Sequence, residues 1–317
     1  MNKSDKIYIA GHTGLAGSAI FQYLKEQGYN NLIVRSHKEL DLTDRNNVDG
    51  FMLEQQPDYV FLAAAKVGGI LANDSYPADF IRENLEIQTN VIDAAWRHNV
   101  KKLLFLGSAC IYPRDAKQPI SEDALLTGEL EPTNQWYALA KIAGIKMCQA
   151  YRRQYGFNAI CLMPTNLYGP GDNFDIEKAH VLAALLRRFH EAAENNSDRV
   201  LVWGTGKPRR EFLHAYDLAE AAAFLMKNYD DEAIINVGCG EDIAIIDLAS
   251  KLAEVVGYQG RIEFDPDRAD GTPRRVLDVS KLTSLGWQAG ISLDQGLKDT
   301  YQWYLRNETT GNLRLQV

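Results

Sequence analysis

The chain has 317 residues, of which 46 % are hydrophobic and 24 % are charged. This composition excludes a disordered, collagen-like or disulfide-scaffold protein, and the length suits one large domain or two smaller ones. The 34 basic and 42 acidic side chains give a net charge of −8. This charge argues against nucleic acid and anionic membranes as partners, because phosphate binding relies on clustered Lys and Arg.

Membrane insertion, secretion and metal binding are not expected either. The longest apolar run, at 59–65, is far short of the roughly 20 residues that span a bilayer, and the first residues lack the apolar core of a signal peptide. The cysteines lie far apart without a CxxC pair, at Cys110, Cys148, Cys161 and Cys239. We therefore expect a cytoplasmic protein with reduced thiols and no zinc site.

Short apolar runs alternate with longer amphipathic segments over the first 165 residues. The expected strands are 7–10, 32–34, 59–63, 103–106 and 159–162. The expected helices between them are 18–27, 44–55, 77–99 and 137–155. This alternation predicts parallel βαβ units with right-handed crossovers, and hence an α/β fold with a Rossmann-type doubly wound parallel sheet.

The pattern loosens after Pro164. Loops rich in Gly and Pro separate helices that we expect near 180–195, 216–227, 246–256 and 293–306. We predict a Rossmann domain at 1–165, to which about 211–240 returns, and a smaller C-terminal α/β lobe at 166–210 and 241–317.

A glycine-rich stretch joins the first strand to the first helix. It reads Gly11-His12-Thr13-Gly14-Leu15-Ala16-Gly17. In this context the glycines permit a tight turn and let backbone N–H groups approach a pyrophosphate at the helix N-terminus. We therefore predict a dinucleotide site, with an ordinary strand-to-helix turn as the alternative.

The end of the second strand bears on the choice of dinucleotide. NAD sites usually place Asp or Glu about 20 residues beyond the glycines, where it binds the ribose 2′-OH. Here the strand is followed by Arg35, Ser36, His37 and Lys38, with no acid among them. Because a guanidinium suits a 2′-phosphate, Arg35 favours NADP(H); a solvated basic strand end is the alternative.

Tyr137 and Lys141 lie four residues apart, on one face of the predicted helix. Ser108 comes just after the fourth strand, at the carboxyl edge where ligands bind in such sheets. An ammonium beside a phenol is expected to lower the pKa of Tyr137, so that this residue can act as a general acid toward a sugar alkoxide. Ser108 would hydrogen-bond the reacting carbonyl.

Further stretches accompany these residues, at 63–70, 107–113, 131–134, 163–170, 203–206 and 210–214. Together with the glycine loop they resemble the extended short-chain dehydrogenase/reductase family over about 6–303, and within it the epimerase/reductases of GDP-sugars. The resemblance implies conversion of GDP-4-keto-6-deoxy-D-mannose to GDP-L-fucose, by 3,5-epimerisation and NADPH-dependent reduction at C4.

Epimerisation next to a ketone needs two groups that exchange protons on opposite faces of the sugar. By the resemblance these are Cys110 and His180; a thiol and an imidazole can both be tuned into the working pH range. Each alone would more simply be structural. Substrate-binding positions carried over by the family match are Arg188, Trp203, Arg210 and Asp270.

The resemblance also implies the cofactor contacts. They are Gly11, His12, Thr13, Gly14, Leu15, Ala16, Gly17, Arg35, Asp41, Leu42, Leu106, Gly107, Lys141, Pro164, Thr165, Asn166, Leu167 and His180. Thr13 stands where relatives carry a basic residue, which leaves Arg35 as the clearest 2′-phosphate partner. The family pairs its subunits through helices that correspond to parts of 84–99 and 138–155, so we expect a homodimer.

Other activities remain open. A 4,6-dehydratase would place acidic residues after Ser108, where this chain has Ala109 and Cys110. A simple 4-epimerase would not need Cys110 and His180. A related GDP-deoxysugar or GDP-heptose enzyme, such as one that forms GDP-L-colitose, could use the same machinery. A non-catalytic NADP(H)-binding regulator is the alternative from another class.

Overall fold

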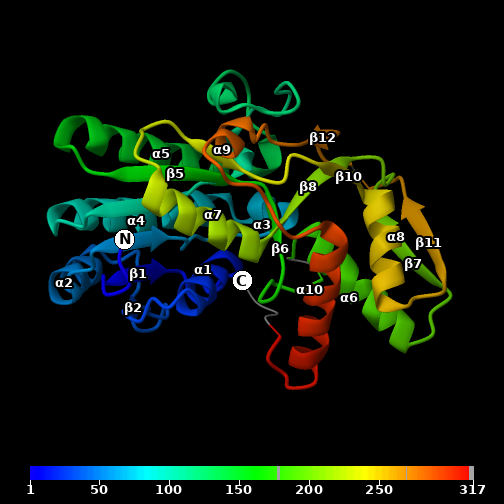
Figure 1. Ribbon diagram of the computed structural model, residues 1–317. Coiled ribbons are helices and arrows are strands. Elements are labelled where there is room, and N and C mark those ends of the chain that lie inside the picture. The colour runs from blue at the N-terminus through cyan, green and yellow to red at the C-terminus, as the bar shows by residue number, and fades with distance from the viewer. Residues whose placement is uncertain (177–178, 269, 314–317) are drawn as a thin grey trace.

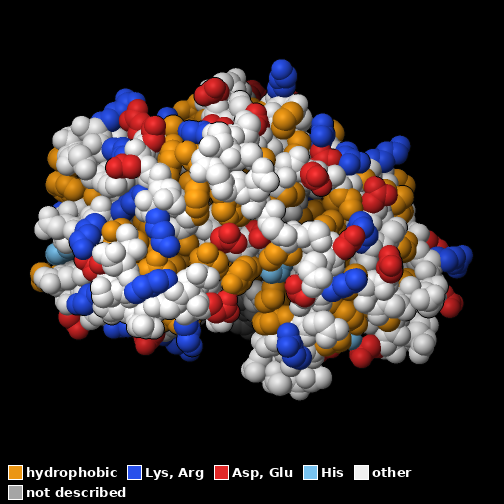
Figure 2. Space-filling view, in the orientation of Figure 1, with side chains coloured by type: hydrophobic (Ala, Val, Ile, Leu, Met, Phe, Trp, Pro, Cys, Tyr) orange, Lys and Arg blue, Asp and Glu red, His pale blue; other side chains and the backbone are white. Residues whose placement is uncertain are grey.

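The computed structural model describes residues 1–176, 179–268 and 270–313. A parallel sheet lies at one end of the molecule, with helices on both of its faces, and a smaller lobe lies at the other end (Figure 1). Lys and Arg side chains are interspersed with Asp and Glu on the face seen in Figure 2.

The sheet has six parallel strands. Their order is β2 (Leu32–Ile33), β1 (Ile7–Ala10), β3 (Tyr59–Leu62), β4 (Lys102–Leu106), β5 (Ala159–Pro164) and β9 (Ile235–Val237). The central strands are buried on both faces, which explains their nearly continuous apolar sequences. The strand order reverses between β1 and β3, and in such sheets a crevice opens at this point, outside the carboxyl ends of the strands.

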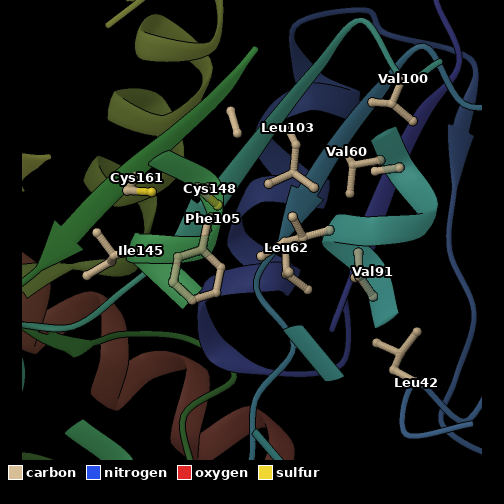
Figure 3. Packing of buried hydrophobic residues seen from close by; sticks show 14 of the residues in the cluster. Leu42, Val60, Leu62, Val91, Val100, Leu103, Phe105, Ile145, Cys148 and Cys161 are labelled. Atoms are coloured by element: carbon tan, nitrogen blue, oxygen red, sulfur yellow. The ribbon is translucent and has the colours of Figure 1, made fainter. Parts of the chain in front are cut away.

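Two apolar layers hold the helices on the sheet. One face carries α2 (Arg45–Gln55), α4 (Pro77–Arg97) and α5 (Gln135–Tyr155), and the other carries α1 (Leu15–Glu26) and α7 (Ala215–Asn228). Alternate residues of a strand face opposite layers, so Tyr8 packs in the first core and Ile9 in the second. Figure 3 shows strand and helix side chains of the first core, among them Leu62, Phe105 and Ile145, packed between sheet and helices.

The second lobe has its own core. It is built from α6 (Val181–Glu194), β7 (Arg199–Trp203), α8 (Ile245–Val256), β11 (Arg261–Asp265) and α10 (Leu293–Glu308). Phe189, Leu252 and Tyr304 are among its fully buried side chains. Strands β7 and β11 pair in parallel.

A small sheet connects the lobes. Strand β8 (Arg209–His214) pairs with β6 (Asn166–Tyr168), β10 (Asp242–Ala244) and β12 (Arg274–Arg275). Phe212 of β8 packs in the core of the second lobe, and its neighbour Leu213 packs against the large sheet.

The structure confirms the doubly wound α/β fold and the expected strands and helices, with ends that shift by a few residues. Unpredicted elements include the short helices α3 (Ile70–Ser75) and α9 (Ser280–Ser284). The division into lobes stays a prediction, but the packing differs from it at one place. Leu282 of α9 and Trp287 pack in the second core of the large sheet, although 241–317 was expected in the smaller lobe.

Two helical glycines give opposite predictions for stability. A Cβ at Gly144 on α5 would lie 2.5 Å from Cζ of Phe105 and 2.7 Å from Oε1 of Gln88, whereas one at Gly50 on α2 would meet nothing within 4 Å. We expect Gly144→Ala to destabilise the fold by about 1–3 kcal/mol through overpacking. Gly50→Ala should stabilise it by about 0.5–1 kcal/mol, because alanine loses less backbone entropy.

Thermal unfolding of both variants beside the unmodified protein measures the two effects. Equal shifts in Tm for the two substitutions would contradict the packing at Gly144.

Candidate active site

The glycine loop forms a cradle at the β1–β3 crevice. The Gly14 N–H donates to the Gly11 carbonyl at 3.0 Å, and Gly11 has a φ of +88°. A Cβ at Gly11 would lie 2.6 Å from the Ala64 nitrogen, and one at Gly17 would collide with the Gly11 carbonyl. No side chain caps α1 at Gly14, so its first N–H groups face outward for a ligand. These residues fit a dinucleotide pyrophosphate.

The four residues 35–38 contain no acid, but the residue after them brings one back to this place. Glu39, a few residues further on, folds back so that its Oε2 accepts hydrogen bonds from the Ser36 N–H and Oγ, each at 2.7 Å. Arg35 donates to the Val34 carbonyl at 2.8 Å, and its guanidinium lies 5.6 Å from the centre of the Phe51 ring. A carboxylate therefore does stand at the end of β2, because the turn after the strand reverses the chain.

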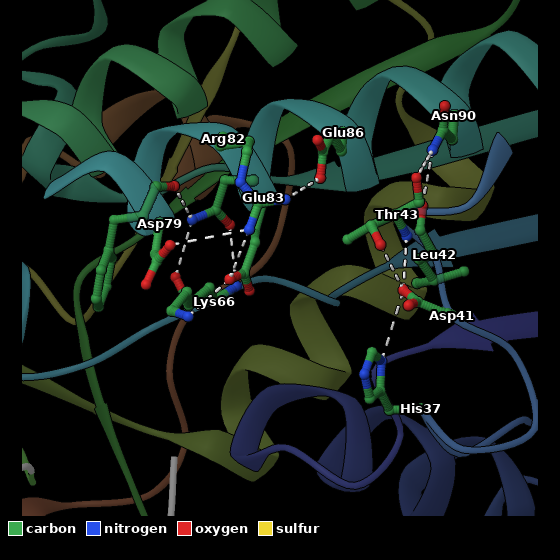
Figure 4. Close-up of polar contacts among 12 residues, drawn as sticks. His37, Asp41, Leu42, Thr43, Lys66, Asp79, Arg82, Glu83, Glu86 and Asn90 are labelled. Carbon is green, nitrogen blue, oxygen red and sulfur yellow. Dashed lines mark hydrogen bonds and ion pairs between the residues drawn. The ribbon is translucent and has the colours of Figure 1, made fainter. Parts of the chain in front are cut away.

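The segment that holds the expected cofactor contacts Asp41 and Leu42 is fixed by α4 (Figure 4). The Asn90 amide donates to the carbonyls of Leu42 and Thr43, both at 3.0 Å. Asp41 accepts from the Thr43 N–H at 2.9 Å and hydroxyl at 2.8 Å, and these bonds hold the Asp41 pKa below its usual range. Leu42 is buried.

The motif at 63–70 follows β3 and is fixed by Asn84 of α4. The Lys66 N–H donates to Oδ1 of Asn84, and Nδ2 of Asn84 donates to the Lys66 carbonyl, both at 3.0 Å. Lys66 Nζ forms an ion pair of 2.8 Å with Glu83 (Figure 4). Asn84 is 2 % exposed. These contacts tie the motif to α4, and Ala64 within the motif lies against Gly11 of the glycine loop.

Ser108, Tyr137 and Lys141 meet at the carboxyl end of β4. Ser108 begins the 3-10 turn Ala109–Ile111, and Tyr137 and Lys141 lie on α5. Lys141 Nζ donates to the Leu106 carbonyl at 2.8 Å and lies 5.7 Å from the centre of the Tyr137 ring. Tyr137 also packs edge-on against Phe80, with 6.5 Å between ring centres.

Protonation at this site runs against the sequence-based expectation. Burial, and then the charge of Cys110, raise the pKa of Tyr137 well above its usual value. Burial also lowers the pKa of Lys141 to about 8, and its ammonium is turned to the Leu106 carbonyl rather than to the phenol. The expected lowering of the Tyr137 pKa is therefore wrong for the free protein, because desolvation outweighs the attraction between the two groups. Tyr137 stands as a protonated acid.

Cys110 shares this edge with Ser108. Its N–H donates to the Ser108 Oγ at 3.3 Å, and its side chain is almost fully buried. Burial raises the thiol pKa, while the Ser108 hydroxyl, Arg275 and Lys141 act in the opposite direction. The thiolate form of Cys110 is thus favoured by these three groups and disfavoured by its burial.

His180 lies on another element, at the N-terminus of α6. Its surface is open to solvent, yet the protein around it is dense enough that desolvation lowers its pKa, which favours the neutral imidazole. No hydrogen bond or ion pair joins it to Cys110 in the described part of the chain. The pairing of these two residues stays a prediction.

Two desolvated arginines lie side by side where the small sheet reaches the site. Arg210 on β8 is in register with Arg275 on β12. Burial lowers the pKa of Arg210 to about 10 and also lowers that of Arg275. Arg275 donates to the Ala109 carbonyl at 3.4 Å, and its buried Nη2 has no partner among the described residues. This pair is suited to a diphosphate.

Arg275 was not among the site residues expected from sequence, although it lies five residues after Asp270. The signal in the sequence was the pair of arginines Arg274 and Arg275. The two arginines acquire different surroundings only when β12 pairs with β8, a segment far away in the chain. The half-exposed Arg274 forms an ion pair with Asp242, whereas Arg275 is desolvated and donates to the Ala109 carbonyl beside Cys110.

Arg188 and Trp203 also lie together. The Arg188 guanidinium lies 4.7 Å from the centre of the Trp203 ring, and that of Arg268 lies 5.1 Å from it. Trp203 is 50 % exposed, so part of the ring is open for stacking. Asp270 accepts from the Thr205 N–H at 2.9 Å and hydroxyl at 2.7 Å, so its carboxylate closes the turn after β7. Its role toward substrate stays a prediction.

The other expected cofactor contacts lie at the carboxyl ends of β4 and β5 and in the residues that directly follow. Leu106 pairs in register with Leu162, one residue before Met163, and a Cβ at Gly107 would collide with the Met163 side chain. The Thr165 N–H donates to the Val237 carbonyl at 3.0 Å, and the Asn166 amide to the Glu211 carbonyl at 2.9 Å. Pro164 and Leu167 flank them in the chain, at the same edge.

The described residues contain no cluster of three or more His, Cys, Asp or Glu side chains that could hold a metal ion. None of the described helices is both long and apolar enough to cross a membrane.

A glycine cradle at a topological switch point, with Ser, Tyr and Lys at the neighbouring strand end, defines a dinucleotide-dependent enzyme of the short-chain dehydrogenase/reductase type. The sequence matches the model of the NAD dependent epimerase/dehydratase family over residues 7–238. The chain belongs to this family.

Individual relatives are similar over nearly the whole chain. "Putative GDP-L-fucose synthase 2" of Arabidopsis thaliana is 60 % identical over 97 % of this chain and 94 % of its own length. GDP-L-fucose synthase of Escherichia coli K12 is 52 % identical, over 96 % of this chain and 97 % of its own. Among solved structures, a GDP-D-glycero-L-gluco-heptose synthase from Campylobacter jejuni, determined in the presence of NADPH, is 41 % identical, with a TM-score of 0.91 over 96 % of this chain and 99 % of that one.

The environment of Cys110 predicts how its reactivity changes with pH. Because burial raises the thiol pKa, the thiolate fraction is small at neutral pH and grows as the pH rises toward and past 9. Alkylation of Cys110 by iodoacetamide should therefore accelerate across this range, as measured by peptide mass spectrometry.

Arg275→Met should slow this alkylation at every pH at which Cys110 is not yet fully ionised, because the guanidinium favours the thiolate. Arg274→Met is the matched control, since it removes the same charge from the neighbouring position, and it should leave the profile in place. A Cys110 profile that is identical in all three proteins would contradict the electrostatic role of Arg275.

Proposed function

We propose that this protein converts GDP-4-keto-6-deoxy-D-mannose into GDP-L-fucose, by epimerisation at C3 and C5 and NADPH-dependent reduction at C4. The observation that carries the proposal is the placement of Cys110 beside Ser108, at the strand end where Tyr137 and Lys141 also lie. A reductase of this fold needs only the last three residues. The thiol adds a group that can exchange protons at the carbons next to the carbonyl.

Epimerisation follows from the two faces of the sugar. Cys110, as thiolate, would remove the proton next to the C4 carbonyl and become a thiol, and His180, as imidazolium, would return a proton to the opposite face and become neutral. The Ser108 hydroxyl and the Tyr137 phenol would donate hydrogen bonds to the C4 oxygen as negative charge develops there. The raised pKa of the phenol keeps a proton on Tyr137, and the charges of Arg275 and Lys141 favour the thiolate form of Cys110 against the effect of its burial.

Reduction uses the same hydrogen bonds to the C4 oxygen. When bound, NADPH supplies the hydride that reduces C4. Tyr137 then gives its proton to the C4 alkoxide, which its protonated state in the free protein permits. Lys141 would bind the nicotinamide ribose, and once it faces the phenol its ammonium would favour transfer of that proton.

The nucleotide end of the substrate has its own partners. Arg210 and Arg275 would bind the diphosphate, because both guanidinium groups are desolvated and neither is within 4 Å of a carboxylate in the described part of the chain. Arg188 would add a third positive charge, and the open part of Trp203 would stack on a planar ring. These residues do not select guanine over other bases. The proposed preference for a GDP-sugar comes from the similarity to the relatives.

We also propose a cytoplasmic homodimer. All four cysteines are free thiols, as in a reducing compartment. Large apolar side chains are exposed on α5, at Trp136, Leu139 and Tyr155, and Tyr155 stacks on Trp96 of α4 at 4.1 Å. This surface of α4 and α5 would pair two subunits.

The direct test is incubation with GDP-4-keto-6-deoxy-D-mannose in D₂O, with and without NADPH, followed by mass spectrometry of the sugar nucleotide. We expect deuterium uptake without NADPH and a reduced, epimerised product with it. Reduction without exchange would leave a simple ketoreductase. No reaction at all would favour another GDP-sugar, such as a heptose or the precursor of GDP-L-colitose, or a non-catalytic NADP(H)-binding protein.

Two substitutions separate the half-reactions. Cys110→Ser should reduce deuterium exchange by about 100-fold or more, because a hydroxyl does not ionise in the working pH range, while NADPH binding stays intact. Tyr137→Phe should reduce the reduction step by a similar factor and keep measurable exchange. Loss of both half-reactions in either variant, with the fold intact by circular dichroism, would contradict the separate roles.

A further inference from the structure

The turn after β2 holds one carboxylate oxygen between two donors. The Ser36 N–H and Oγ both donate to Oε2 of Glu39 at 2.7 Å. The N–H groups of Glu39 and Leu40 donate to the Ser36 carbonyl at 3.0 and 2.9 Å, which closes the turn. In this fold the end of the second strand is where the adenosine ribose of a dinucleotide lies.

Residues from two segments act electrostatically on the same carboxylate. The bonds from Ser36 lower the pKa of Glu39 most, and Arg35 and His12 lower it further, so Glu39 is ionised at neutral pH. His12 belongs to the glycine loop, and its buried Nδ1 has no partner among the described residues. Arg35 stands at the end of β2, where its Nη1 donates to the Val34 carbonyl at 2.8 Å.

A backbone N–H and a hydroxyl that already hold an anion, with an arginine as the preceding residue, are groups that typically bind a phosphate. We propose that Glu39 is an internal anion that occupies the 2′-phosphate subsite and thereby limits the preference for NADPH over NADH. This inference rests on the dinucleotide site of the proposed function. A phosphate that enters must displace the carboxylate or accept its repulsion, whereas the 2′-OH of NADH can donate to it.

The simpler reading is that Glu39 only stabilises the turn. The spacing Ser36-x-x-Glu39 is that of a capping box, in which the carboxylate returns to the N–H of the first residue. In that case a loss of charge would affect both nucleotides equally or not at all. The two readings therefore differ in the ratio of the two affinities.

Fluorescence titration of the full-length protein with NADPH and with NADH, without any sugar nucleotide, measures this ratio. Glu39→Gln removes the charge but keeps an amide oxygen that can accept from Ser36. We expect the Kd for NADPH to fall about fivefold at low salt and the Kd for NADH not to fall. The gain should shrink in about 0.5 M NaCl, because salt screens exposed charges.

Glu54→Gln is the matched control, since Glu54 is an exposed carboxylate near the far end of α2 and its loss changes the net charge equally. Its titrations should match those of the unmodified protein. Equal changes for both nucleotides in Glu39→Gln, or weaker NADPH binding, would overturn the inference. If the unmodified protein bound no NADPH, the cofactor assignment itself would fail, and the absence of sugar from the assay separates that failure from failure of the epimerase chemistry.

Discussion

The hydrogen bond from Lys141 to the Leu106 carbonyl is the contact on which the rest of the site depends. It joins the middle of α5 to the last residue of β4, across a place that water does not reach. Because α5 also carries Tyr137, the same bond sets the height of the phenol above the strand end. Ser108 and Cys110 follow β4 directly, so their position relative to the phenol is fixed by one helix and one strand.

A second contact that positions the site is made by Glu211, the residue next to Arg210 in β8. Glu211 is fully buried, and its two carboxylate oxygens accept from the Gly240 N–H at 2.7 Å and the Leu277 N–H at 2.9 Å. Burial raises its pKa, and these backbone bonds oppose that effect. Glu211 thereby ties β8 to the loop after β9 and to the segment after β12, and its neighbour Arg210 is held in register with Arg275.

Much of the sheet could be predicted from sequence, because its strands are continuous apolar runs and its helices have strong amphipathic patterns. The residues at the ends of β1 and β4 were also predictable, since parallel strands share a carboxyl edge. Short elements such as β12 were not, because two residues become a strand only when a distant segment pairs with them. Arg275 was missed for that reason.

Protonation states were the least predictable feature. Spacing places Tyr137 and Lys141 on one helix face, but it does not reveal that Lys141 is buried and Tyr137 partly buried. Desolvation reversed the expected shift of the phenol pKa. Glu39 was overlooked for a related reason, since the sequence gives the distance of an acid along the chain and not the turn that brings it back to Ser36.

The position of Arg275 has a consequence for how substrate binding affects the rate. One of its nitrogens bonds the Ala109 carbonyl, next to Cys110, and another is buried without a partner among the described residues. If a diphosphate binds here as proposed, the contact that satisfies the second nitrogen would also fix the first against the loop that carries the thiol. A part of the substrate that does not react would then help to order the reacting group, and a keto sugar without its nucleotide would lose turnover as well as affinity.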